Sequence, residues 1–409
     1  MKRELEVSEL EAPAPSKKPR KADPDNSLAL PIDLIDIIAG YSTPLMEELN
    51  SVAGSSFHCR YQPELDKRAA KQLMAYVLNP TAENIVKAKA MYAANPRIMF
   101  IETEGYELAS GIEGYVDEKT GEPCTRLVYR KVIGSAFQAV LGTGDSELYY
   151  DMATHFDKIV YKSESGEIET GAQRALKQIQ ARFPNGFDYP PTDDTFNTLI
   201  ADIAEAITND QTLITTDRPN EATRAALTRL RQYLLPKDVT QGHHFNLSQL
   251  IKACEIYNQN WNPWNENQRP LFWRQVIGYL QRLAPVVDAQ AFCTGLYYLQ
   301  EENEPLSRPA ELTIHNDSKS SDEKYYLSNA SLAGLGFDFG IYMDGPRGAG
   351  EGHWRAGWLA ARGGRARVEK LCRAKTSDLG HFHRQLAERA NPTTTEPPQT
   401  VRNSLMKRK

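Results

Sequence analysis

The sequence predicts a mainly α-helical protein, a multi-helix array with a few short β-strands or hairpins. Apolar residues recur at helical spacing over most of the chain, and stop signals such as Asn95-Pro96 close these stripes. Short extended runs are expected near residues 97–101, 126–132 and 337–343. Hydrophobic residues make up 41% and charged residues 25% of the chain, which is the composition of a globular protein rather than of a disordered one.

Charge, hydropathy and cysteine content exclude several classes of function. The net charge of −5 excludes a globally basic nucleic-acid coat, so nucleic acid is not an expected partner. No stretch approaches 18 consecutive apolar residues, so stable insertion into a membrane is not expected. The 5 cysteines are far apart and form no CxxC pair, which argues against a disulfide scaffold and against a zinc site. A reducing compartment is therefore expected.

Residues 1–27 are charged and rich in proline, and we expect them to form a disordered arm without the apolar core of a signal peptide. Export through a cleaved signal is therefore not expected, which leaves open delivery by a dedicated secretion machine. The arm carries a basic run, Lys17, Lys18, Arg20 and Lys21. Such a run is typical of a nuclear-import signal, because an extended basic segment fits an acidic groove. The other interpretation is a solubilising tail.

Residues 28–80 read as short amphipathic helices. The first has Pro31 in its opening turn and an aliphatic ridge spaced as on one helix face: Leu30, Leu34, Ile35, Ile38 and Tyr41. A second piece extends to Phe57, and a third is expected over 63–78. Helices that open with Leu-Pro and a run of aliphatics resemble an F-box over about residues 28–65. The resemblance implies that Leu30, Pro31, Leu34, Ile35, Ile38 and Tyr41 bind the adaptor subunit of a cullin-type ubiquitin ligase. The alternative is a helical hairpin that packs on its neighbours.

Residues 81–160 combine a hairpin with a helical unit that resembles an ankyrin repeat. A helix is expected from Ser135, and Gly144 can supply the left-handed turn before a return helix over 146–156. A single unit of this kind cannot bury its own face, so it must pack on flanking helices. Together with the basic arm and the Leu-Pro helices, this order of parts resembles Legionella-type translocated effectors of intracellular bacteria. That resemblance implies delivery into a host cell, to the cytoplasm or, if the basic run acts, to the nucleus.

Residues 161–343 are expected to form a helical body, and 344–409 a basic region with a flexible tail. Three tryptophans, Trp261, Trp264 and Trp273, crowd into an Asn-rich stretch and form either a recognition surface or plugs that pin a loop to the core. Between residues 355 and 375 basic residues far outnumber acids, and Lys375 ends the run. The basic patch proposed within it is Arg362, Arg365, Arg367, Lys370 and Arg373. One interpretation is that this patch binds RNA, an acidic lipid or an acidic partner protein. The other is that it is a solvated helix face.

Two hypotheses of different class follow from these patterns. The first is a non-enzymatic adaptor in which residues 28–65 hold a ligase subunit and the helical body selects a second target. The second is an enzyme that modifies a host protein through Cys372 or Cys254, with a histidine such as His381 or His383 as base. The sequence contains no HExxH, GxSxG or kinase motif and no dinucleotide fingerprint. We therefore favour the adaptor, and we expect neither a cofactor nor a bound metal.

Overall fold

The computed structural model describes Thr43, residues 55–116, 123–162, 166–216, 218–288 and 354–391, and four short strands at 312–314, 323–325, 339–340 and 350–351. The chain divides into two compact units, Met1–Leu65 and Asp66–Lys409. Helices dominate the described residues, and their strands form two-stranded antiparallel pairs. The expectation of a mainly α-helical protein with a few β-hairpins is confirmed. None of the helices in these ranges combines the length and the apolar character that crossing a membrane requires.

The helix α3 (Ser55–Leu78) runs through Pro63, where we expected one helix to end and another to begin. A proline inside a helix removes one backbone donor and costs about 3 kcal/mol. The helix is amphipathic beyond this point, and each fully buried large apolar side chain contributes about 1.5–3 kcal/mol. The buried side chains are Ala70, Leu73, Met74, Val77 and Leu78. Their burial offsets the cost of the proline.

The helix α4 (Ala82–Ala94) begins and ends where the sequence predicts. Thr81 caps it by accepting a hydrogen bond from the Asn84 N–H at 3.0 Å, and Asn95 follows its last turn. Residues 97–101, which we expected to be extended, instead form the 3-10 helix η1 (Pro96–Phe100) and the residue after it. The strand prediction was wrong because a short apolar run has no period that separates a strand from a buried helical turn.

The strand expected at 126–132 lies within β2 (Pro123–Gly134), and its antiparallel partner is β1 (Thr103–Val116). Side chains alternate across this hairpin as on a sheet with one face against a core: Glu107 and Arg130 are buried, whereas Tyr106 and Tyr129 are each 50% exposed. Farther along the chain, β7 (Phe339–Gly340) lies inside the third expected strand and pairs with β8 (Gly350–Glu351). A further pair is formed by β5 (Leu312–Ile314) and β6 (Glu323–Tyr325).

Two short helices follow the hairpin, α5 (Ala136–Thr143) and α6 (Ser146–Ala153). Ser135 and Gln138 form a capping box at the start of α5, and Gly144 ends it in the left-handed conformation at φ 68°, as the sequence predicts. The chain continues through η2 (Phe156–Lys158) and the hairpin of β3 (Val160–Lys162) and β4 (Ile168–Thr170). The helix α7 (Gly171–Arg182) then packs on α5. The return helix is shorter than expected.

The remaining helices form a second group. Their apolar stripes are those expected from the sequence: Phe196, Ile200, Ile203 and Ile207 are all fully buried. The elements are α8 (Asp194–Asn209), η3 (Gln211–Ile214), α9 (Glu221–Tyr233), α10 (Leu247–Asn260), α11 (Gln268–Phe272), the π-helix η4 (Trp273–Gly278) and α12 (Tyr279–Leu283). The last three run on as one continuous helical stretch.

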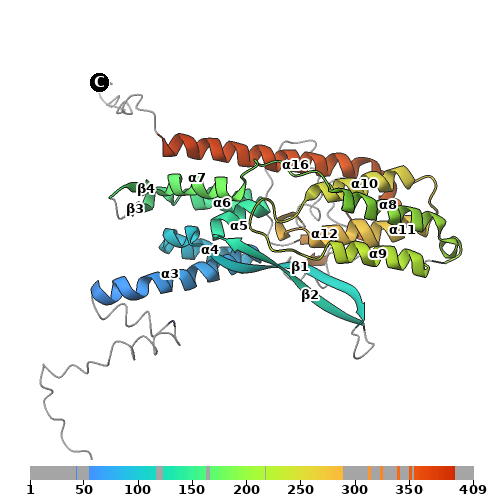
Figure 1. Cartoon of the computed structure of the whole chain (residues 1–409), viewed down its shortest axis with the longest axis horizontal. Coiled ribbons are helices and arrows are strands. Elements are labelled where there is room, and N and C mark those ends of the chain that lie inside the picture. Colours follow the sequence, from blue (N-terminus) through green and yellow to red (C-terminus); the bar gives the residue numbers. More distant parts are fainter. Residues whose placement is uncertain are drawn as a thin grey trace, which may run out of the picture. The chain divides into compact units, whose positions relative to one another are not determined.

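The long helix α16 (Trp354–Ala390) connects two hydrophobic clusters (Figure 1). The first cluster lies among α8 to α12 and includes Val368 and Leu371 of α16. The second lies among α3 to α7 and includes Leu379 and Phe382, farther along the same helix. The hairpin of β1 and β2 also contacts both clusters, through Ala109 in the first and Val132 in the second. The protein core is therefore two packed groups of helices that share a helix and a hairpin.

Candidate functional site

The proposed N-terminal sites lie outside the described residues. These are the basic run of Lys17, Lys18, Arg20 and Lys21, and the aliphatic ridge of Leu30, Pro31, Leu34, Ile35, Ile38 and Tyr41. Their roles stay predictions from the sequence.

Within the described part of the basic run at 355–375, the cations differ in exposure. Arg365 and Arg373 are exposed and Lys370 is half-buried, but Lys375 is only 3% exposed. The Arg365 Nε donates to Glu369 Oε1 at 2.8 Å, so one charge of the proposed patch is already paired. The structure does not describe the side chains of Arg362 and Arg367. Lys375, which follows the proposed patch, is turned into the core by the helix, and the patch of Arg362, Arg365, Arg367, Lys370 and Arg373 stays a prediction.

The cysteines and histidines of the enzyme hypothesis differ in burial: Cys254 is buried, Cys372 and His383 are half-buried, and His381 is exposed. Burial raises the pKa of the Cys254 thiol and of the Cys372 thiol to about 12, the opposite of what a nucleophilic thiolate requires. His381 and His383 lie two residues apart on a helix, where such residues do not face each other. The His383 ring packs 5.8 Å from that of Phe187. Among the described residues, no group of three or more His, Cys, Asp or Glu side chains is placed to hold a metal.

Two of the three clustered tryptophans, Trp264 and Trp273, are plugs, whereas Trp261 is half-buried. Trp264 and Trp273 are almost fully buried, and the Trp264 Nε1 donates to Thr208 Oγ1 at 2.8 Å. Both rings stand against Tyr257 of α10. A buried indole needs a partner for its single N–H, and Thr208 on α8 supplies it. The contacts of Trp264 pin the segment between α10 and α11 to the first cluster.

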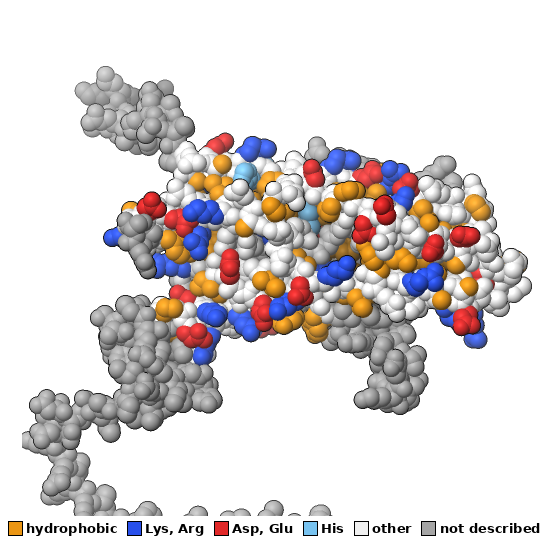
Figure 2. Space-filling model, in the orientation of Figure 1, with side chains coloured by type: hydrophobic (Ala, Val, Ile, Leu, Met, Phe, Trp, Pro, Cys, Tyr) orange, Lys and Arg blue, Asp and Glu red, His pale blue; other side chains and the backbone are white. Residues whose placement is uncertain are grey.

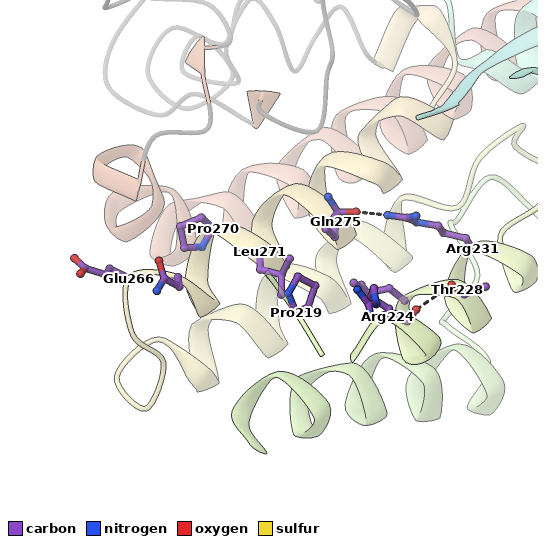
Figure 3. Close-up of a pocket in the computed structure, with 10 residues that line it drawn as sticks. Pro219, Arg224, Thr228, Arg231, Glu266, Pro270, Leu271 and Gln275 are labelled. Atoms are coloured by element: carbon purple, nitrogen blue, oxygen red, sulfur yellow. Dashed lines mark hydrogen bonds between the residues drawn. The ribbon is translucent and has the colours of Figure 1, made fainter. Parts of the chain in front are cut away.

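A polar pocket of about 610 Å³ lies between α9 and the segment from Glu266 to Gln275 (Figure 3). We call it the α9 groove. Its α9 wall consists of Arg224, Leu227, Thr228 and Arg231, and Pro219 precedes them. Its other wall consists of Glu266, Asn267, Pro270, Leu271 and Gln275. The spacing of the two arginines, seven residues apart on one helix, was visible in the sequence, but the opposite wall was not.

A second set of polar residues is buried where the two hydrophobic clusters meet, and we call it the polar seam. It consists of Glu107, Arg130, Arg182, His244, Asp288 and Lys375, each no more than 5% exposed. No sequence signal marks it, because its members come from segments far apart in the chain. A pocket of about 250 Å³ opens beside it, lined in part by Arg130 and His244.

Ion pairs hold the seam together. The Arg130 Nη1 pairs with Glu107 Oε2, and the Arg130 Nη2 donates to the Leu283 carbonyl at 2.6 Å. Burial alone raises the Glu107 pKa, but the charges and hydrogen bonds of His244 and Arg130 lower it to about 2. Ionised Glu107 can only accept, so the His244 Nδ1 carries the proton that it donates to Glu107 at 3.2 Å. Lys375 likewise pairs with Asp288 and donates to the Thr143 carbonyl at 2.9 Å.

Arg182 is the exception within the seam. Its side chain is fully buried, and none of its three guanidinium nitrogens has a hydrogen-bond partner among the described residues. Burial lowers its pKa to about 10, against the attraction of Glu107, so it stays charged at neutral pH. A Cβ on Gly142 would stand 2.4 Å from the Arg182 Nη2 and 2.6 Å from the His244 Nε2. Glycine is therefore needed at position 142 to let these two side chains approach the backbone of α5.

We expect the free energy of unfolding to fall as the pH drops from about 6.5 toward 4. Burial lowers the pKa of both His243 and His244 to about 4. The unfolded chain binds protons below a pH of about 6.5, whereas the folded chain does not until about 4, so the loss is a few kcal/mol. Urea unfolding at pH 7.5, 6.0 and 5.0 measures it. The variant His244→Gln should lose less stability over this range than the wild type; an equal slope would contradict the prediction.

Comparison with known proteins gives one finding. Residues 249–386 match the family model described as the CBUA0006 C-terminal domain. The match begins in α10, includes Pro270, Leu271 and Gln275 of the α9 groove, and continues to Leu386 of α16. Neither the curated proteins nor the solved structures gave a match. The likeness to this family is thus confined to residues 249–386, which cover less than half of the chain.

Proposed function

We propose that the protein is a host-directed effector that acts as a non-enzymatic adaptor. In this proposal residues 28–65 recruit a cullin-type ubiquitin ligase through its adaptor subunit, and the helical body binds the target. The observation that carries the proposal is the state of the thiols. With the pKa of Cys254 and of Cys372 raised to about 12, neither supplies the thiolate on which the enzyme hypothesis depends.

Two features support a binding role for the body. The α9 groove is an open, polar cavity of about 610 Å³ on the surface of a well-packed helical group. The helices α5 and α6 are joined by the left-handed Gly144, and α5 packs on the flanking α7. The ankyrin-like unit predicted at these helices would add a binding surface, since such repeat units commonly serve as scaffolds for protein recognition.

Ligase recruitment is tested by the double substitution Leu34→Asp with Ile38→Asp. If the aliphatic ridge grips the ligase adaptor subunit, two carboxylates in that interface abolish co-purification, because burying an unpaired charge is strongly unfavourable. The measurement is pull-down of the purified adaptor subunit by the full chain. A matched control places aspartate at two exposed aliphatic residues, Val86 and Ile168, which are 68% and 67% exposed. The control should bind as the wild type does. Undiminished binding by the ridge variant would remove the proposal.

A further inference from the structure

The α9 groove presents two arginines along one face of one helix. Arg224, Leu227, Thr228 and Arg231 recur at positions i, i+3, i+4 and i+7, so their side chains leave α9 on the same side. Seven residues of helix span about 10 Å. The two guanidinium groups therefore stand about two turns apart along the groove, a spacing that suits a short peptide rather than a single small ion.

Arg231 is held in position by contacts with Gln275 and Tyr279 across the groove. Its Nη2 donates to Gln275 Oε1 (Figure 3). Its guanidinium lies 5.7 Å from the centroid of the Tyr279 ring. Gln275 belongs to the π-helix η4, an irregularity that is frequent at functional sites. Burial lowers the pKa of Arg231, which remains a cation at neutral pH. A cation fixed in this way loses little conformational entropy when an anion binds.

Arg224 is the second cation of the groove. It is exposed and makes no ion pair within the described residues. Its neighbour on the same helix, Arg229, behaves differently: it does not line the groove, and its Nη2 lies 3.7 Å from Asp202 Oδ2. Arg229 is therefore a matched control on the same helix.

The lining of the groove selects among anionic ligands. Arginine binds carboxylates in a bidentate geometry, and Leu227, Leu271 and Pro270 offer apolar contacts between the two arginines and beside them. Glu266 lies at the opposite end from Arg231, which disfavours a continuous polyanion (Figure 3). Figure 2 shows acidic and basic side chains interspersed over the face in view, and the net charge is −5, so no broad field attracts nucleic acid to this face.

We propose that the α9 groove binds an extended acidic peptide segment of a partner protein, with carboxylates on Arg224 and Arg231 and an apolar side chain between them. This inference rests on the proposed adaptor function and names the chemistry of the target that the body selects. Gln275 acts as a positioning residue, since it orients Arg231.

The test is fluorescence anisotropy of the full chain with a labelled hexapeptide of glutamate and leucine, and with the same peptide carrying glutamine for glutamate. The glutamate peptide should bind, more weakly as salt rises, and the glutamine peptide should not. Arg224→Glu should weaken binding about tenfold or more, because it replaces attraction by repulsion at an exposed site. Arg229→Glu should bind as the wild type does. Gln275→Leu should lower the affinity for the glutamate peptide, and a higher peptide concentration should still saturate this variant, because the binding site itself remains.

Several results would overturn the inference: no binding of the glutamate peptide, equal weakening by Arg224→Glu and Arg229→Glu, or stronger binding of a single-stranded oligonucleotide at the same groove. Displacement of the peptide by millimolar inorganic phosphate alone would also overturn it, since the groove would then be a site for a small anion. The Leu34→Asp with Ile38→Asp variant should bind the peptide normally, and Arg224→Glu should still capture the ligase subunit. Failure of the peptide site and failure of ligase recruitment are thus distinguishable.

Discussion

The substitution Lys375→Met is expected to lower the free energy of unfolding by about 3–5 kcal/mol, because it leaves Asp288 buried without its cation. Asp288 is 2% exposed, and burial raises its pKa despite the opposing charge of Lys375. Lys375 also donates to the Thr143 carbonyl, so its removal takes a second partner from the seam. On α16 it lies between Leu371 of the first cluster and Leu379 of the second. We expect the damage to loosen the contact of α16 with both.

Urea unfolding of the variant and of two others measures this effect. Lys370→Met changes a half-buried lysine on the same helix and should cost less than about 1 kcal/mol, as for most surface positions. The double variant Lys375→Met with Asp288→Leu removes both charges and should recover much of the loss, because replacing a buried ion pair by apolar residues is often close to neutral. If Lys375→Met unfolds at the same urea concentration as Lys370→Met, the buried pair does not stabilise the protein.

The second large effect is expected for Gly171→Ala, at about 3 kcal/mol of lost stability. A Cβ at this first residue of α7 would stand 2.5 Å from the Phe156 carbonyl oxygen and 3.0 Å from the Phe156 Cα. Both atoms belong to the backbone, so they move only if η2 shifts as a whole. The Gly171 N–H also donates to the Ile159 carbonyl at 3.0 Å, which keeps the two segments close. Thermal unfolding should show the loss as a lower Tm.

The matched control is Gly380→Ala, in the interior of α16. There a Cβ would meet nothing nearer than Arg384 Nη1 at 3.8 Å. Alanine is a better helix former than glycine by about 1 kcal/mol, so this variant should raise the Tm. A loss of stability at both positions would mean that close approach to η2 is not what position 171 requires.

Much of the local structure follows from the sequence. The apolar stripe on α8, the Thr81 cap and the Asn95 stop of α4, and the left-handed Gly144 each depend on residues within a few positions of one another. Short-range patterns of this kind report periodicity and backbone preference directly. The prediction of a strand at 97–101 was wrong although it also used short-range patterns, since a five-residue apolar run is compatible with both a strand and a 3-10 turn.

The candidate sites could be predicted less well from the sequence than the helices could. Periodicity places Arg224 and Arg231 on one helix face, but Gln275 reaches them only because α9 and η4 pack side by side. Arg373 and Lys375 belong to the same basic run, yet the first is exposed and the second is buried against Asp288. Nothing in the run itself separates the two, because burial depends on what packs against the helix.

The sequence alone therefore determined the helical class and the bounds of elements such as α4 and α5, since these depend on local order and composition. The tertiary structure alone decided which charges are buried, which thiols are inert and where a groove opens. Those properties arise when segments far apart in the chain are brought together: Glu107 meets His244, and Asp288 meets Lys375. The desolvation that sets their pKa values exists only once the two hydrophobic clusters have packed around them.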